Sequence, residues 1–191
     1  MQARMIASLI AVASLVGLAG CAPTSGVITG TSGPQVGSLA PDVQYVSAEG
    51  KHGDFNKARY PVAVIAFSAP EGANCCWLDP KVVNVAGQLW DLPVTVAQFS
   101  LPKGKCPHGQ GCMEACNLRK GGLMSLCDAQ RLAWNAYGQP APGSLILIGP
   151  DNKILVTGSL DNPKAVLDEA RNLGQAEKKR RDAAGNRIDT Y

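Results

Sequence analysis

Residues 62–67 form a continuous apolar stretch rich in β-branched residues, which predicts a strand buried on both faces of a sheet. The apolar stretches at 93–99 and 145–148 predict two further strands. A turn signal, Gly-Pro-Asp-Asn at 149–152, predicts that residues 153–157 fold back as a hairpin strand. The pattern therefore predicts four strands in the central part of the chain.

A helix is predicted between the first two strands. Asp79-Pro80 provides an N-cap followed by a proline at the first helical position, and the apolar pattern continues to about Trp90. The side chains expected on its apolar face are Val82, Val83, Val85, Ala86, Leu89 and Trp90.

Two more helices are predicted in the second half of the chain. Asp128 starts the first of them and Gly138 closes it, with Leu132, Trp134 and Tyr137 along it. Asn162-Pro163 again provides a cap and a proline, and starts a last helix that continues through residue 173.

The predicted order is therefore strand, helix, strand, long loop, helix, strand, strand, helix. A β-α-β crossover followed by a hairpin and a helix is the arrangement of thioredoxin-like proteins. The sequence predicts an α/β protein of thioredoxin-like fold, with a central mixed sheet flanked by helices. The long loop, residues 100–126, would be a cysteine-rich insertion in that fold.

Three segments resemble the peroxiredoxin and redoxin branch of that fold. Residues 36–42 (VGSLAPD) are similar to its "vGxxAPdF" opening, and Leu126-Cys127-Asp128 with the following helix is similar to its "l-x-D" helix. Residues 139–148 (QPAPGSLILI) resemble a segment whose proline is cis and faces the active cysteine. By its spacing to the strand, Pro142 corresponds to that proline.

Composition narrows the class of protein. The chain has 191 residues, of which 46% are hydrophobic and 17% charged, as expected of one globular domain and not of a disordered chain. A net charge of +3 without a basic stripe gives no indication of nucleic-acid binding. Seven cysteines favour an oxidising compartment.

The N-terminal sequence indicates which oxidising compartment the protein occupies. Residues 5–18 form an apolar core that is too short to span a bilayer comfortably. Its last residue begins the sequence Leu-Ala-Gly-Cys at 18–21. This ending resembles the lipobox of bacterial lipoproteins, which implies cleavage of residues 1–20 and lipidation of Cys21. Acyl chains on Cys21 would anchor the protein stably. Ala22 favours, by the same resemblance, the outer membrane facing the periplasm.

The remaining chain divides into three parts. Residues 21–36 are rich in Gly, Ser, Thr and Pro and are expected to be a flexible tether. Residues 37–173 would form the thioredoxin-like domain. Residues 174–191 are expected to be a polar basic tail with a solvated, frayed helix end.

Candidate chemistry lies where the first strand meets the first helix, because backbone N–H groups and the helix dipole there stabilise a thiolate. On the thioredoxin pattern F-W-A-x-W-C-G-P-C, Cys75 takes the place of the second cysteine and Gly72 that of the first, so a CxxC centre is absent. On the peroxiredoxin pattern P-x-x-x-T-x-x-C, Cys76 takes the peroxidatic position, but Ala73 replaces the threonine that orients a peroxide.

Cys76 is therefore the first candidate for the attacking sulfur, and Cys75 the second. A loop cysteine, Cys127 or Cys106 before others, would resolve the disulfide, and Pro142 would close the other side of the site. The implied activity is disulfide exchange or peroxide reduction on a protein or peroxide substrate, with no cofactor.

Two other functions remain open. The six cysteines left after lipidation, including Cys106, Cys112, Cys116 and Cys127, can form three structural disulfides in a redox-inactive protein that binds a partner. Alternatively, three of the loop cysteines with His108 could bind a soft metal such as Cu(I) or Zn(II), although their spacing matches no zinc pattern. His52 stands alone in a predicted polar turn and is expected to be solvated.

Overall fold

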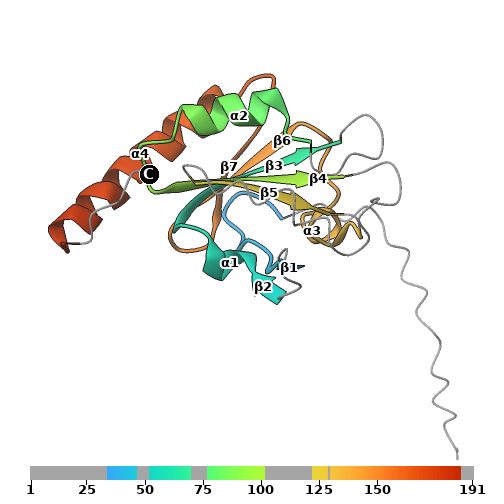
Figure 1. Ribbon diagram of the computed structural model, residues 1–191, viewed down its shortest axis with the longest axis horizontal. Coiled ribbons are helices and arrows are strands. Elements are labelled where there is room, and N and C mark those ends of the chain that lie inside the picture. The colour runs from blue at the N-terminus through green and yellow to red at the C-terminus, as the bar shows by residue number, and fades with distance from the viewer. Residues whose placement is uncertain (1–33, 47–51, 70–76, 102–121, 129, 186–191) are drawn as a thin grey trace, which may run out of the picture. The chain divides into compact units, whose positions relative to one another are not determined.

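A computed structural model describes five stretches of the chain, residues 34–46, 52–69, 77–101, 122–128 and 130–185 (Figure 1). They all belong to one compact unit of the chain. The predicted signal peptide, most of the tether, the sequence around Cys75 and Cys76, and residues 102–121 of the cysteine-rich loop lie outside the described residues.

A five-stranded mixed sheet, in the order β5-β4-β3-β6-β7, forms the centre of this unit. Its strands are β3 (Val62–Ser68), β4 (Val94–Ser100), β5 (Leu123–Cys127), β6 (Ser144–Ile148) and β7 (Ile154–Ser159). β3, β4 and β5 run parallel, whereas β6 is antiparallel to β3 and β7 is antiparallel to β6. The four predicted strands are confirmed.

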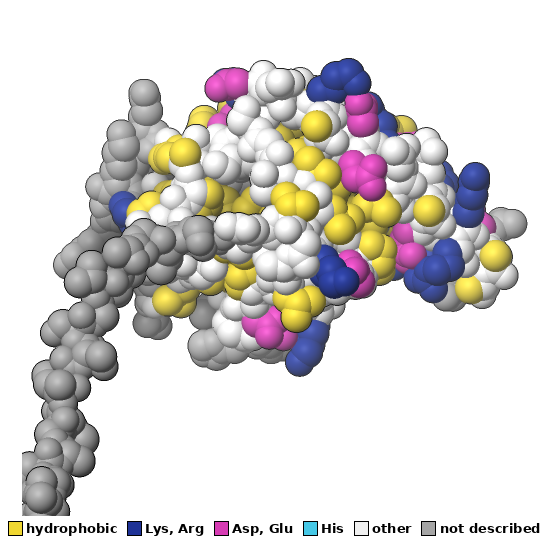
Figure 2. Space-filling view, turned by 180° about the vertical axis from the view of Figure 1, so that it is seen from behind, with side chains coloured by type: hydrophobic (Ala, Val, Ile, Leu, Met, Phe, Trp, Pro, Cys, Tyr) yellow, Lys and Arg dark blue, Asp and Glu magenta, His cyan; other side chains and the backbone are white. Residues whose placement is uncertain are grey.

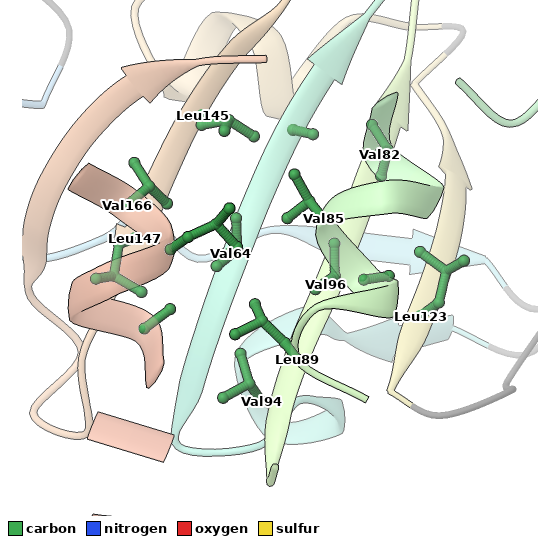
Figure 3. Packing of buried hydrophobic residues seen from close by; sticks show 14 of the residues in the cluster. Val64, Val82, Val85, Leu89, Val94, Val96, Leu123, Leu145, Leu147 and Val166 are labelled. Carbon is green, nitrogen blue, oxygen red and sulfur yellow. The ribbon is translucent and has the colours of Figure 1, made fainter. Parts of the chain in front are cut away.

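Helices α2 (Pro80–Gly87) and α4 (Lys164–Ala183) cover one face of the sheet (Figure 1). Val82, Val85 and Leu89 lie against Val64 and Val96 of the sheet, as Figure 3 shows. Burial of such aliphatic side chains stabilises the fold by roughly 1.5–3 kcal/mol each.

The opposite face is covered by α1 (Phe55–Ala58), α3 (Leu132–Ala136) and a small hairpin of β1 (Gln44–Val46) and β2 (His52–Asp54). Phe55 and Tyr137 are buried there against aromatic side chains of the sheet. His52 begins β2 in place of the predicted turn.

The start of α2 is as predicted, since the Asp79 carboxylate accepts a hydrogen bond from the Lys81 N–H at 2.9 Å. Its end is not, because α2 stops at Gly87 and the chain then turns into β4. Trp90 is 62% exposed and Val83 is 45% exposed, so the prediction that both lie on the apolar face is wrong.

β5 is not among the predicted strands, because the predicted long loop includes residues 123–126. The strand has only five residues and lies at an edge of the sheet, where its single partner is β4. The prediction that Asp128 begins a helix is wrong by four residues. Arg131 takes a left-handed conformation (φ 56°) and α3 starts only at Leu132.

The last helix also differs from its prediction. Its N-cap is Pro163, and no side chain provides a cap, so the predicted capping role of Asn162 is wrong. The helix continues ten residues beyond the predicted end, to Ala183. Glu177 is the physical reason, because it is 6% exposed and accepts hydrogen bonds from both Arg180 and Arg181.

Charged side chains of both signs are interspersed around exposed hydrophobic ones on the face shown in Figure 2. Within the described residues, no helix is both long and apolar enough to span a membrane.

Candidate functional site

The carboxyl ends of the three parallel strands meet at one edge of the sheet. There Ser68 of β3 is in register with Ser100 of β4, which is in register with Cys127 of β5. We call these three residues the polar row. Two residues earlier on each strand lies the second row, which consists of Ala66, Gln98 and Ser125.

Both rows face α2. Side chains alternate between the two faces of a strand, and those of Val64, Val96 and Leu123 lie in the core beneath α2 and α4. Residues at even positions of β3 and β4 and at odd positions of β5 therefore share this face. The face is apolar along most of its length and becomes polar in these two rows.

Gln98 is the centre of the polar hydrogen-bond network in these rows. Its side chain is fully buried, and its Oε1 accepts a hydrogen bond from the Asp79 N–H at 2.9 Å. Its Nε2 donates to the Trp77 carbonyl oxygen and to Ser100 Oγ, each at 2.7 Å. One amide therefore holds the start of α2 against β4 and also fixes a hydroxyl of the polar row.

The best sequence candidates, Cys75 and Cys76, lie outside the described residues, between two flanks that the structure does describe. Ser68 ends β3 on one side, and on the other Trp77 is held by Gln98. Both flanks belong to the edge at which the polar row lies.

Two buried hydroxyls in these rows have no hydrogen-bond partner within the described part of the chain. Ser68 is 2% exposed and Ser125 is 1% exposed, and neither Oγ has a hydrogen-bond partner among the described residues. A buried polar group without a partner costs roughly 1–3 kcal/mol. The face beneath the start of α2 therefore offers polar atoms that its described surroundings do not satisfy.

Cys127, half-buried, ends β5 at the same edge. The next residue, Asp128, fixes the chain direction there: its N–H donates to the Ser100 carbonyl oxygen at 2.9 Å. Its carboxylate accepts from the Trp134 N–H at 2.7 Å and from the Ala133 N–H at 3.3 Å. Burial raises the pKa of the Asp128 carboxyl, and the peptide N–H groups that it accepts from act in the opposite direction.

Pro142 lies beside the carboxyl end of β3, because the Gly143 N–H donates to the Phe67 carbonyl oxygen at 2.7 Å. The prediction that Pro142 follows a cis peptide bond is wrong, since all described peptide bonds are trans. The chain enters β6 instead through Gly143, at a φ of +90° that favours glycine.

Five other predicted residues, Cys21, Cys106, His108, Cys112 and Cys116, lie outside the described residues. The part of the chain that is described contains no cluster of three or more metal-ligating side chains. Sequence reasoning missed Ser68, Gln98, Ser100 and Ser125. Their signal is a polar residue at a strand position that shares a face with valines.

No family model matches the chain, and no curated protein matches it. Among solved structures, BsSco, a member of the Sco family of cytochrome c oxidase assembly proteins in which a disulfide switch was identified, aligns with a TM-score of 0.50 at 15% identity. The alignment covers 76% of this chain and 98% of that one.

A hypothetical protein from Sinorhizobium meliloti 1021 also aligns with a TM-score of 0.50, at 16% identity over 67% of this chain and 72% of that one. A putative thioredoxin from Neisseria meningitidis aligns with a TM-score of 0.49 at 23% identity, over 74% and 95%. The thioredoxin-like fold, a mixed sheet flanked by helices, is confirmed.

Proposed function

We propose that this protein is a thiol–disulfide redox protein that exchanges disulfides with a protein substrate in the bacterial envelope. The observation that carries the proposal is the edge at which β3, β4 and β5 end. A vicinal cysteine pair follows β3 in the sequence, and Cys127 ends β5 at that edge, beside buried polar groups.

The chemistry needs two cysteines. The Cys76 thiolate attacks one sulfur of a substrate disulfide and forms a mixed disulfide, while the other substrate sulfur leaves as a thiolate and takes up a proton. The Cys127 thiolate then attacks the Cys76 sulfur and releases the second substrate thiolate. Two electrons pass to the substrate, and the protein is left with a Cys76–Cys127 disulfide.

A disulfide is favoured over a peroxide as the substrate. Ala73 stands where the peroxiredoxin pattern has the threonine that orients a peroxide. The similarity in fold to BsSco, in which a disulfide switch was identified, supports the same choice.

Trypsin separates the candidate cysteines, which makes the proposal testable in the full chain. Residues 60–81 contain only Cys75 and Cys76, residues 106–119 contain three loop cysteines, and residues 121–131 contain only Cys127. After one equivalent of a model disulfide is added to the reduced protein, we expect peptides 60–81 and 121–131 to be joined.

Reduction of that one equivalent by the reduced protein, called turnover below, should be lost in Cys76→Ser and kept in Cys116→Ser, the matched control in the loop. Unchanged turnover in both Cys75→Ser and Cys76→Ser would contradict the proposal. So would three disulfides that persist unchanged through the reaction, which indicate a structural role. Consumption of hydrogen peroxide at a rate above that of the disulfide would assign the peroxide instead.

We further propose that acyl chains on Cys21 anchor the protein to the membrane. The Leu-Ala-Gly-Cys sequence at 18–21 supports this. Cys21→Ala is expected to stop incorporation of a labelled fatty acid and to leave the signal uncleaved or release the protein from the membrane fraction. A Cys21→Ala variant that still incorporates the label would refute the anchor.

A further inference from the structure

We propose that Ser100 is a positioning residue for Cys127. Its hydroxyl, oriented by Gln98, donates a hydrogen bond to the Cys127 sulfur and favours the thiolate. The inference rests on the proposed function for the role it gives Cys127, the resolving thiol.

Strand register puts the two side chains next to each other. Ser100 and Cys127 are partners across the parallel β4–β5 ladder, where strands are about 4.8 Å apart. Partners in register point to the same face of a sheet, so both side chains face α2. Asp128 reinforces the register through its hydrogen bond to the Ser100 carbonyl oxygen.

The hydrogen-bond inventory of Ser100 gives the direction of its proton. A serine hydroxyl has one donor and accepts through its lone pairs. Gln98 Nε2 already donates to Ser100 Oγ, so the Ser100 hydrogen points to another acceptor. Of its two partners in the polar row, Ser68 has no hydrogen bond to its Oγ among the described residues. Cys127 is the remaining partner in that row.

The surroundings independently indicate that this face receives a polar group. Ser68 and Ser125 on the same face carry buried hydroxyls without a described partner. An apolar group bound against this face would leave these hydroxyls at their full desolvation cost, whereas a bound sulfur substrate can accept from them.

The consequence is chemical. A hydrogen bond to the charged form of a group favours that form, so Ser100 should lower the pKa of the Cys127 thiol below the ~8.5 of an unperturbed cysteine. More of Cys127 is then thiolate at neutral pH, ready to attack a mixed disulfide. Because Gln98 also holds Trp77 and Asp79, one amide orients the start of α2 and this hydroxyl together.

The test is the pH dependence of alkylation at Cys127 in the fully reduced, full-length protein. Isotope-coded iodoacetamide is quenched at timed points, and the label is read on tryptic peptide 121–131, in which Cys127 is the only cysteine. Three proteins are compared, namely the wild type, Ser100→Ala and Ser125→Ala. The matched control removes a buried serine hydroxyl from the same face, one row back.

We expect Ser100→Ala to slow alkylation of Cys127 at pH 7 about three- to tenfold, as the loss of one hydrogen bond to a thiolate predicts. Above about pH 10, where the thiol is ionised in every variant, the rates should converge. Ser125→Ala should stay within about twofold of the wild type at all pH values, because Ser125 is paired with Gln98 and the residue paired with Cys127 is Ser100.

Superimposable profiles for the wild type and Ser100→Ala would overturn the proposal, as would an equal shift in Ser125→Ala. If Ser100→Ala does not fold, the wild-type profile decides alone, since a Cys127 pKa at or above ~8.5 contradicts the assignment. These readouts do not depend on turnover. Loss of disulfide turnover in Cys76→Ser with no Ser100 effect would keep the proposed function and reject only this inference.

Discussion

Replacing Gln98 by leucine tests whether one amide holds the start of α2 to the sheet. Leucine fills a similar volume but can neither donate nor accept, so three hydrogen bonds are lost. Their partners are the Asp79 N–H, the Trp77 carbonyl oxygen and Ser100 Oγ. The substitution is therefore a change of hydrogen bonding with little change of packing.

The magnitude follows from those three bonds. Each contributes about 1 kcal/mol net, which sums to about 3 kcal/mol. Asp79 and Trp77 are only half-buried, so water can replace part of what they lose, and the leucine side chain adds apolar burial. We expect Gln98→Leu to lower the free energy of unfolding by about 2 kcal/mol.

Urea unfolding under reducing conditions, followed by circular dichroism, measures this difference without a contribution from disulfides. Ser125→Ala is the matched control, because it removes a buried hydroxyl that has no described partner. It should leave the free energy of unfolding unchanged or raise it. Equal midpoints for Gln98→Leu and the wild type, or equal losses for both variants, would refute the role given to Gln98.

Two further predictions concern α4, and Gly87 of α2 provides the control for the second. Hydrogen bonds from Arg180, and then from Arg181, lower the pKa of Glu177 from 4.5 to about 2. The Glu177 carboxylate therefore adds stability above about pH 4.5 that is lost as the pH falls toward 2. In Glu177→Gln, the free energy of unfolding should depend less on pH over that interval. A Cβ on Gly174 would come within 2.8 Å of Val94 Cγ2, whereas one on Gly87 would meet nothing within 4 Å. Gly174→Ala should therefore lower the thermal midpoint and Gly87→Ala should raise the free energy of unfolding by about 0.5–1 kcal/mol, and a gain in both would contradict the close packing of α4.

The strands that are buried on both faces of the sheet could be predicted from the sequence. β3 and β6 are buried on both faces along most of their length, so residues 62–67 and 145–148 are apolar without interruption and indicate strands from the sequence alone. β5 could not be recognised in the same way, because it has five residues and its identity as a strand depends on pairing with β4. The end of α4 depends on contacts of Glu177 with two arginines, which a count of apolar residues does not detect.

The site was predictable only in part. The place of Cys75 and Cys76 before Asp79-Pro80 follows from the sequence, and the structure describes both flanks of that segment. The link between Ser100 and Cys127 could not be predicted, because it requires the register of two strands separated by the cysteine-rich loop. One signal was present in the sequence of β4. Gln98 and Ser100 continue the same alternation as Val94 and Val96, so the change from apolar to polar on one face indicates where the core ends and a site begins.

The composition of the two rows also determines what kind of activation is available to a thiol there. Their six residues provide hydroxyl and amide groups but no charged side chain, and the nearest carboxylate in sequence, that of Asp128, is directed to the N–H groups of α3. Among the described residues of these two rows, the groups that can stabilise a thiolate at Cys127 are therefore neutral hydrogen-bond donors. Coulombic stabilisation between exposed charges weakens as salt is added, whereas a direct hydrogen bond inside a buried row is screened little. The pKa of Cys127 should therefore change little between low and high ionic strength and should rise in Ser100→Ala. A thiol activated by a neighbouring cation would show the opposite, namely a pKa that depends on salt and does not respond to Ser100→Ala.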